Sequence, residues 1–115
     1  MKNKRYPRKY SRDEDFEELY NHFEQLFCPS FWGFEIGPGW FEIIADFVIK
    51  LDYHLRRNPN MIREKYIIMQ VKEKFGSLRI YLHSSDFYLN SLIAETEKQA
   101  ANSCTICGKK VEKVF

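Results

Sequence analysis

Two short segments in which apolar and polar residues alternate constrain the fold of this chain most strongly. They predict two strands, one over residues 66–73 and one over residues 78–83. Because Phe75-Gly76-Ser77 separates them, we expect an antiparallel hairpin. A two-stranded sheet alone is only marginally stable in water, so helices have to cover one of its faces.

The spacing of apolar residues predicts two helices before the hairpin and one after it. The first, over residues 11–28, opens with the capping box Ser11-Arg12-Asp13-Glu14. The second runs from about residue 40 to residue 58, where Pro59 disfavours further helical backbone. The third follows N-cap candidates in residues 84–86 and ends near residue 102.

These elements predict an α+β fold with the order α-α-β-β-α, in which helices cover one face of the hairpin. The pattern also accommodates a third strand within residues 31–36. A length of 115 residues fits one domain. We therefore expect a flexible basic arm over residues 1–10, a single domain over residues 11–103 and a short cysteine-containing tail over residues 104–115.

The charges are segregated along the chain. Residues 1–12 contain six Lys and Arg and no acid, which leaves 12 basic and 16 acidic residues for the rest, a net charge of −4. This distribution argues against a broad nucleic-acid-binding face on the body of the protein. The arm itself has three open interpretations: contact with nucleic acid, docking on the acidic first helix, or solubility.

Composition and patterning also bear on location. The chain has no run of eighteen apolar residues, so we expect no transmembrane helix and no membrane partner. The basic N-terminus is not followed by an apolar stretch, which argues against a secretory signal. Three cysteines, two of them in a C-x-x-C pair, are typical of cytosolic thiols or metal ligands rather than a disulfide framework. We expect a cytoplasmic protein.

The polar face of the predicted hairpin is the first candidate binding site. If Met69, Val71, Ile80 and Leu82 face the core, a mixed basic and aromatic set lies on the other side, namely Gln70, Lys72, Lys74, Arg79, Tyr81 and His83. Such groups suit phosphates, bases or an acidic partner. The alternative is an ordinary solvated sheet face, which antiparallel sheets often have.

Cys104-Thr105-Ile106-Cys107-Gly108 is the sharpest local motif. Two thiolates at this spacing, followed by glycine, form half of a tetrahedral zinc site. No Cys or His follows Cys107, so a complete site would need Cys28, one of the three histidines (His22, His54, His83) or a second chain. Two free or structural cysteines are the alternative interpretation, and a redox pair fits less well because such a pair normally opens a helix.

The centre of the chain reads Gln70-Val71-Lys72-Glu73-Lys74-Phe75-Gly76-Ser77-Leu78-Arg79-Ile80-Tyr81, with a Gly-Trp-started helix before it and the C-x-x-C-G motif after it. In these features the chain resembles a group of small uncharacterised proteins of phages and bacteria. The resemblance covers about residues 39–108 and implies a phage or prophage origin. It carries over no catalytic residue. Some members of the group continue past the cysteines into a second ligand pair, which this sequence lacks.

No P-loop, dinucleotide-binding, zinc-protease or nucleophile-elbow motif is present. We therefore expect a non-enzymatic binding protein that captures a host protein or a nucleotide-like signal molecule, as a monomer or a homodimer. A nucleic-acid-binding module that uses the basic arm and the hairpin face is the first alternative. An enzyme whose site has no sequence signature is the second, since catalytic groups need only be close in space.

Overall fold

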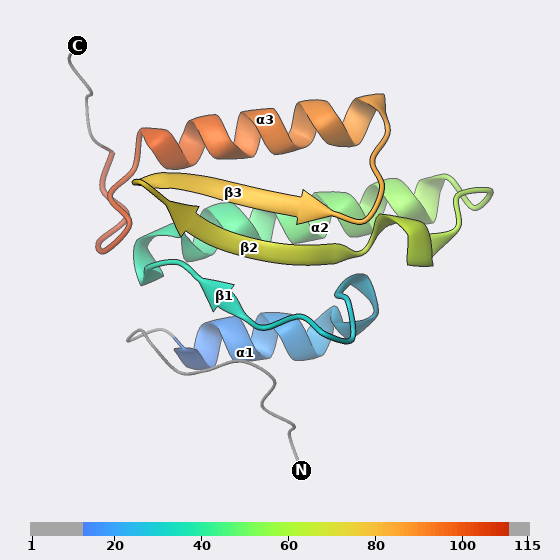
Figure 1. Ribbon diagram of the computed structural model, residues 1–115, viewed down its shortest axis with the longest axis horizontal. Helices are drawn as coiled ribbons and strands as arrows, with labels where there is room; N and C mark the ends of the chain where they lie inside the picture. The colour runs from blue at the N-terminus through green and yellow to red at the C-terminus, as the bar shows by residue number, and fades with distance from the viewer. Residues whose placement is uncertain (1–12, 111–115) are drawn as a thin grey trace.

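The structure is a computed structural model that describes residues 13–110 (Figure 1). It consists of three α-helices and a three-stranded sheet, so the coarse α+β class is confirmed. The helices are α1 (Asp13–His22), α2 (Phe41–Arg57) and α3 (Phe87–Ala101), and the strands are β1 (Phe34–Glu35), β2 (Ile68–Lys74) and β3 (Ser77–Leu82). Three 3-10 turns join them: η1 (Glu24–Leu26), η2 (Pro38–Trp40) and η3 (Arg63–Tyr66).

The expected order α-α-β-β-α needs correction, because β1 lies between the first two helices. The sheet order is β1-β2-β3; β1 pairs with β2 in parallel, and β2 pairs with β3 in the antiparallel sense. The first helix also ends earlier than predicted, at His22, and the chain continues through η1. Ser11 of the predicted capping box, the basic arm over residues 1–10 and residues 111–115 lie outside the described residues.

A cluster of aromatic rings holds α1 and β1 together. Phe16 of α1 stacks on Phe34 of β1 with ring centroids 4.9 Å apart, and Tyr20 stacks on Phe31 at 5.9 Å. Phe27 completes the cluster by contacting both Phe31 and Phe34. These rings supply the apolar surface that so short a strand cannot bury by itself.

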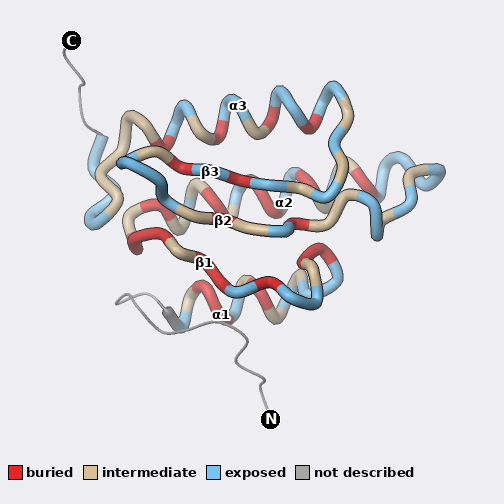
Figure 2. The backbone as a smooth tube through the Cα atoms, in the orientation of Figure 1, coloured by how far each residue is buried: buried red, intermediate tan, exposed pale blue. Residues whose placement is uncertain are grey.

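Helix α2 lies behind the sheet and α3 runs beside β3, so the opposite face of the sheet stays open (Figures 1 and 2). Residues alternate between buried and exposed along β3, as its sequence predicts. The N–H of Ile80 points out of the sheet edge and donates to Glu97 Oε2 of α3 at 3.2 Å. This helix therefore covers one edge of the sheet as well as part of its inner face.

The orientation of β2 corrects one prediction. The pairing with β3 is irregular between Ile68 and Gln70, which indicates a β-bulge. Ile68 and Val71 are consequently buried, whereas Met69, predicted to face the core, is 38% exposed. After the bulge, Val71 faces the core and Gln70 and Lys72 face away from it, as predicted.

The loop that contains the C-x-x-C motif packs on the loop that precedes α2. Gly39 N–H donates to the Thr105 carbonyl at 2.7 Å, and the buried Trp40 indole donates to the Ser103 carbonyl at 3.1 Å. A Cβ atom on Gly39 would lie 2.2 Å from the Cys104 carbonyl oxygen and 2.5 Å from Gly108 N. The segment from Ser103 to Gly108 thus packs on the loop before α2 through backbone contacts that require glycine.

None of the helices in residues 13–110 has the length and apolarity needed to cross a membrane.

At the other end of the helical layer, α2 and α3 are joined by a histidine and a carboxylate. His54 Nε2 lies 2.9 Å from Asp86 Oδ2, and the Asp86 side chain also caps α3 by accepting from Leu89 N–H at 2.7 Å. The His54 ring stacks on Tyr88 with centroids 4.3 Å apart. Partial burial acts to raise the pKa of Asp86, but the hydrogen bonds from His54 and Leu89 outweigh it, so the pKa lies below its ordinary value.

We expect Gly39→Ala to lower the free energy of unfolding by about 3 kcal/mol, because the added methyl group would displace the backbone of the C-x-x-C loop. Gly76→Ala is the matched control. A Cβ on Gly76 meets nothing within 4 Å, so this change should cost only about 1 kcal/mol through its positive φ of 81°. Urea unfolding monitored by tryptophan fluorescence measures both values, and equal losses would contradict the close-approach argument.

A second prediction concerns acid stability. Since its pKa in the folded protein is lowered, Asp86 contributes stability above its unfolded pKa of about 3.9, and this contribution is lost as the pH falls through the folded pKa. Asp86→Asn should keep the helix cap but be less stable than the unmodified chain at pH 7, by about 1 kcal/mol. The difference should vanish in thermal unfolding at pH 2. A gap between the two proteins that is independent of pH would refute this assignment.

Candidate functional site

The open face of the sheet carries the central residues of the predicted site. Gln70 pairs with Tyr81 and Lys72 pairs with Arg79 across β2 and β3, while the intervening partners Val71 and Ile80 are buried. Because side chains alternate along a strand, these four polar side chains project from the open face. The structure therefore brings together Gln70, Lys72, Arg79 and Tyr81 on one surface, which we call the open sheet face.

Lys74 and His83 lie at opposite ends of this surface. Lys74 is the last residue of β2 and pairs with Ser77 beside the turn. His83 follows β3, is exposed, and donates its backbone N–H to the Ile67 carbonyl at 2.9 Å. The predicted set therefore extends along the length of the sheet and does not converge on one point.

Glu35 belongs to this surface and was missed by the sequence analysis. In the parallel pairing of β1 with β2, Glu35 is the register partner of Lys72. One row across the sheet thus reads Glu35, Lys72, Arg79, with one carboxylate beside two cations. Only the parallel pairing of β1 reveals this neighbour, and the two residues of that strand carry too little pattern to predict it.

The cations of the open sheet face are not neutralised by local ion pairs. Within the described part of the chain, no carboxylate oxygen lies within 4.0 Å of the charged nitrogens of Lys72, Lys74 or Arg79. Lys72 Nζ lies 6.0 Å from the centre of the Tyr81 ring, at the outer limit of a cation–π contact. Opposed like charges are destabilising in a sheet, so the Lys72–Arg79 pair would be stabilised by an external anion.

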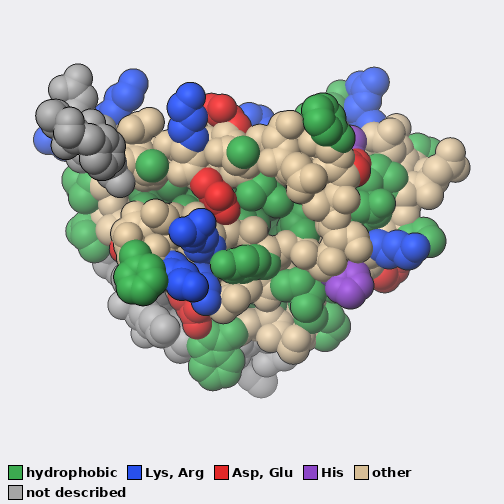
Figure 3. All heavy atoms as spheres, turned by 45° about the horizontal axis from the view of Figure 1, so that its top comes forward, with side chains coloured by type: hydrophobic (Ala, Val, Ile, Leu, Met, Phe, Trp, Pro, Cys, Tyr) green, Lys and Arg blue, Asp and Glu red, His purple; other side chains and the backbone are tan. Residues whose placement is uncertain are grey.

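An aromatic side chain projects from the turn between β2 and β3. Phe75 is 94% exposed and has a φ of +54°, and the following Gly76 has a φ of +81°. Two successive positive φ values are typical of the type I′ turn, in which Asn-Gly is favoured over Phe-Gly. Figure 3 shows Lys and Arg side chains beside hydrophobic ones over the end of the sheet where the two strands join. The exposed Phe75 ring and its positive φ do not contribute to the packing of the domain.

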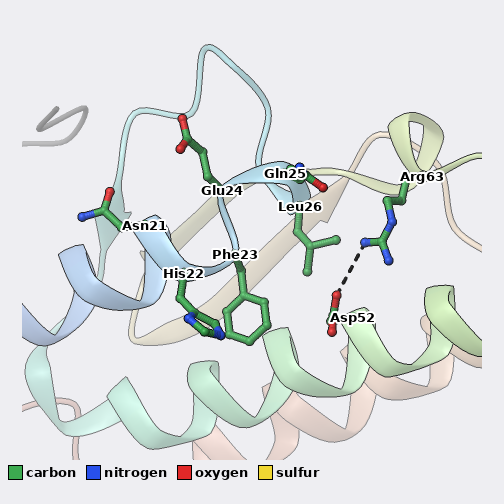
Figure 4. Close-up of a pocket in the computed structure, with 8 residues that line it drawn as sticks. All are labelled: Asn21, His22, Phe23, Glu24, Gln25, Leu26, Asp52 and Arg63. Atoms are coloured by element: carbon green, nitrogen blue, oxygen red, sulfur yellow. Dashed lines mark ion pairs between the residues drawn. The ribbon is translucent and has the colours of Figure 1, made fainter. Parts of the chain in front are cut away.

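Two adjoining hollows lie near the opposite end of the sheet. The first has a volume of about 330 Å³, and in Figure 4 its lining residues converge from the end of α1, η1, α2 and η3. Arg63 points toward Asp52 there, with 3.5 Å between Nη1 and Oδ1. The second hollow, of about 510 Å³, shares Glu24, Gln25 and Arg63 with the first. We call the two hollows together the groove. Of the candidate site residues named from the sequence, only His22 lines it.

The cysteine pair forms a compact loop. Cys104 Sγ accepts the N–H groups of Ile106 and Cys107, each at 3.4 Å, and Gly108 N–H donates to the Cys104 carbonyl at 2.8 Å. Hydrogen bonds from the backbone N–H groups of Cys107 and Ile106 hold the pKa of the Cys104 thiol below its ordinary value. The hydrogen bond from Cys107 has the larger effect. The loop has the hydrogen bonding expected of half a metal site.

The in-chain ligands considered for zinc do not join this pair. Cys28 lies beside Ser30, with Sγ 3.1 Å from Oγ, and His54 is engaged by Asp86. In residues 13–110 no three Cys, His, Asp or Glu side chains form a group suited to a metal ion. Of the sources of further zinc ligands that the sequence predicts, a second chain is therefore the one compatible with this geometry.

We expect Phe75→Asn to raise the melting temperature by about 2–5 °C, because asparagine adopts positive φ more readily than phenylalanine and the ring makes almost no contact. Phe87→Asn is the matched control, since Phe87 is 86% exposed but lies in helical backbone. It should leave the melting temperature unchanged or lower it. Destabilisation by Phe75→Asn in differential scanning calorimetry would show that the ring supports the fold.

Comparison with known proteins leaves the chain without an assigned family: no family model, no curated protein and no solved structure matches it.

Proposed function

We propose that this chain is a non-enzymatic binding protein and that the open sheet face captures a partner protein. The observation that carries the proposal is that Lys72, Lys74 and Arg79 have no ion-pair partner among residues 13–110, while the Phe75 ring at the adjoining turn is 94% exposed. If the phage origin implied by the sequence resemblance holds, the partner is a host protein.

The composition of the face favours a protein surface as the ligand. Protein interfaces are enriched in Phe, Tyr, Met and Arg at their centres, and Arg79 and Tyr81 of the face and Phe75 of the adjoining turn are of these types. A flat array of this kind suits another surface, whereas a nucleotide-like molecule is usually enclosed in a concave pocket. The groove of Figure 4 is lined by residues that do not belong to the open sheet face.

The charges indicate which kind of partner surface fits. Lys72 and Arg79 are opposed across the strands with Glu35 as one neighbouring acid, so the row retains a positive charge that Lys74 increases. A partner with carboxylates around an apolar pocket would pair with the cations and accept the Phe75 ring. The net charge of −4 after residue 12 opposes the long-range attraction of a nucleic acid, which makes the nucleic-acid module the less favoured alternative.

The test compares charge removal on the open sheet face with equal charge removal on the helical side. Lys72→Ala/Arg79→Ala should weaken capture of the partner at least about a hundredfold, since each of the two lost charge-assisted contacts is worth about 1.5–3 kcal/mol. The control is Lys50→Ala/Lys98→Ala, two exposed lysines of α2 and α3. Quantitative affinity purification from host extract, followed by titration of the identified partner, measures both variants.

Three outcomes decide between the candidate functions. Loss of the partner in the open-face variant alone supports the proposal. Retention of every partner by that variant would refute it, and the groove lined by Arg63 would then become the leading site. Binding that is abolished by nuclease and falls steeply with salt would instead favour nucleic acid.

A further inference from the structure

The Cys104–Gly108 loop is ordered by its own hydrogen bonds. The two N–H groups directed at Cys104 Sγ, each 3.4 Å away, supply the positive dipoles that a thiolate ligand requires. Gly108, with a φ of +79°, turns the chain back so that its N–H bonds to the Cys104 carbonyl at 2.8 Å. This arrangement needs no further folding to present its sulfur atoms.

The loop is also fixed to the body of the domain. Thr105 accepts hydrogen bonds at its carbonyl from Gly39 N–H and at Oγ1 from Gly37 N–H, at 2.7 and 3.2 Å. The glycines allow contact so close that a Cβ on either would lie within 2.3 Å of backbone oxygen. A metal ligand pair held this firmly loses little conformational entropy on binding, which favours a stable site.

Within residues 13–110, Cys104 and Cys107 supply half of a tetrahedral zinc site. In residues 13–110 no third Cys, His, Asp or Glu joins Cys104 and Cys107. Residues 1–12 and 111–115 contain neither Cys nor His, and Glu112 is the one carboxylate side chain among them. Structural zinc sites hold about four such ligands. We propose that two copies of this chain bind one zinc ion between them, through Cys104 and Cys107 of each copy.

The surroundings of the pair suit a symmetric contact. Cys107 is exposed, and Ile106 beside it is 64% exposed, so two facing loops would bury apolar surface around the metal. Zinc with four thiolates carries a net charge of −2. Lys109 and Lys110 of each copy, which follow Cys107 after Gly108, would offset this charge. A two-fold axis through the zinc ion would place all these groups in equivalent positions.

Zinc titration of the purified full chain tests the inference. We expect about one zinc ion per two chains by elemental analysis, and a shift from monomer to dimer by analytical ultracentrifugation that chelation reverses. Cobalt in place of zinc should give the visible absorption of a tetrahedral thiolate site. Cys107→Ser, at an exposed position, should abolish metal uptake and dimer formation together while the circular dichroism spectrum is unchanged. Cys28→Ser, the matched control, should leave both intact.

Each alternative result overturns the inference. One zinc ion per monomer would place the remaining ligands within the chain, and absence of zinc binding would identify the cysteines as free thiols. Zinc that stays bound in Cys107→Ser would be adventitious. A dimer that forms equally well without metal would show that the loops are not the contact. Because the open sheet face takes no part, none of these results bears on partner capture.

Discussion

The packing of the Cys104–Gly108 loop on the segment before α2 is the contact on which the arrangement of the domain depends. It joins the end of α3 to the start of α2, so the helical layer is tied at both ends, here by backbone hydrogen bonds and at the far end by His54 and Asp86. With α2 and α3 fixed in this way, the sheet can bury one face and expose the other. This contact gives Gly37, Gly39 and Trp40 a structural role.

The open sheet face follows from that asymmetry. Three helices pack behind and beside a sheet of three strands, and none crosses its front (Figure 1). A face without a covering layer would ordinarily carry balanced charges, yet here two cations are opposed and a phenylalanine occupies a turn position that suits asparagine. Both features disfavour the isolated domain, and the partner that we propose would pair the cations and bury the ring. Stability has been given up at the part of the surface that we propose to be functional.

Much of this architecture could be predicted from residue patterns, and the failures have identifiable physical causes. The alternation along β3 placed Arg79 and Tyr81 on the correct face, since alternation is a local property of a strand. Met69 was misplaced because a bulge inserts one residue, and no residue type in that segment marks it. Glu35 was missed because its position depends on a parallel pairing between segments 37 residues apart. The attachment of the cysteine loop to Gly37 and Gly39 is likewise a long-range contact, although the glycines that permit it were visible.

The ion–dipole contact between Glu97 and the N–H of Ile80 has a consequence for the behaviour of the protein in a crowded cell. A free sheet edge is a template on which further strands, including those of other copies, can add. The long edge of this sheet is closed by α3 and its carboxylate, and the other is the two-residue strand β1, too short to specify a register. Fibre-like growth through strand addition is therefore disfavoured at both sides. We therefore expect this domain, despite its exposed sheet surface, to associate through side chains rather than through strand addition.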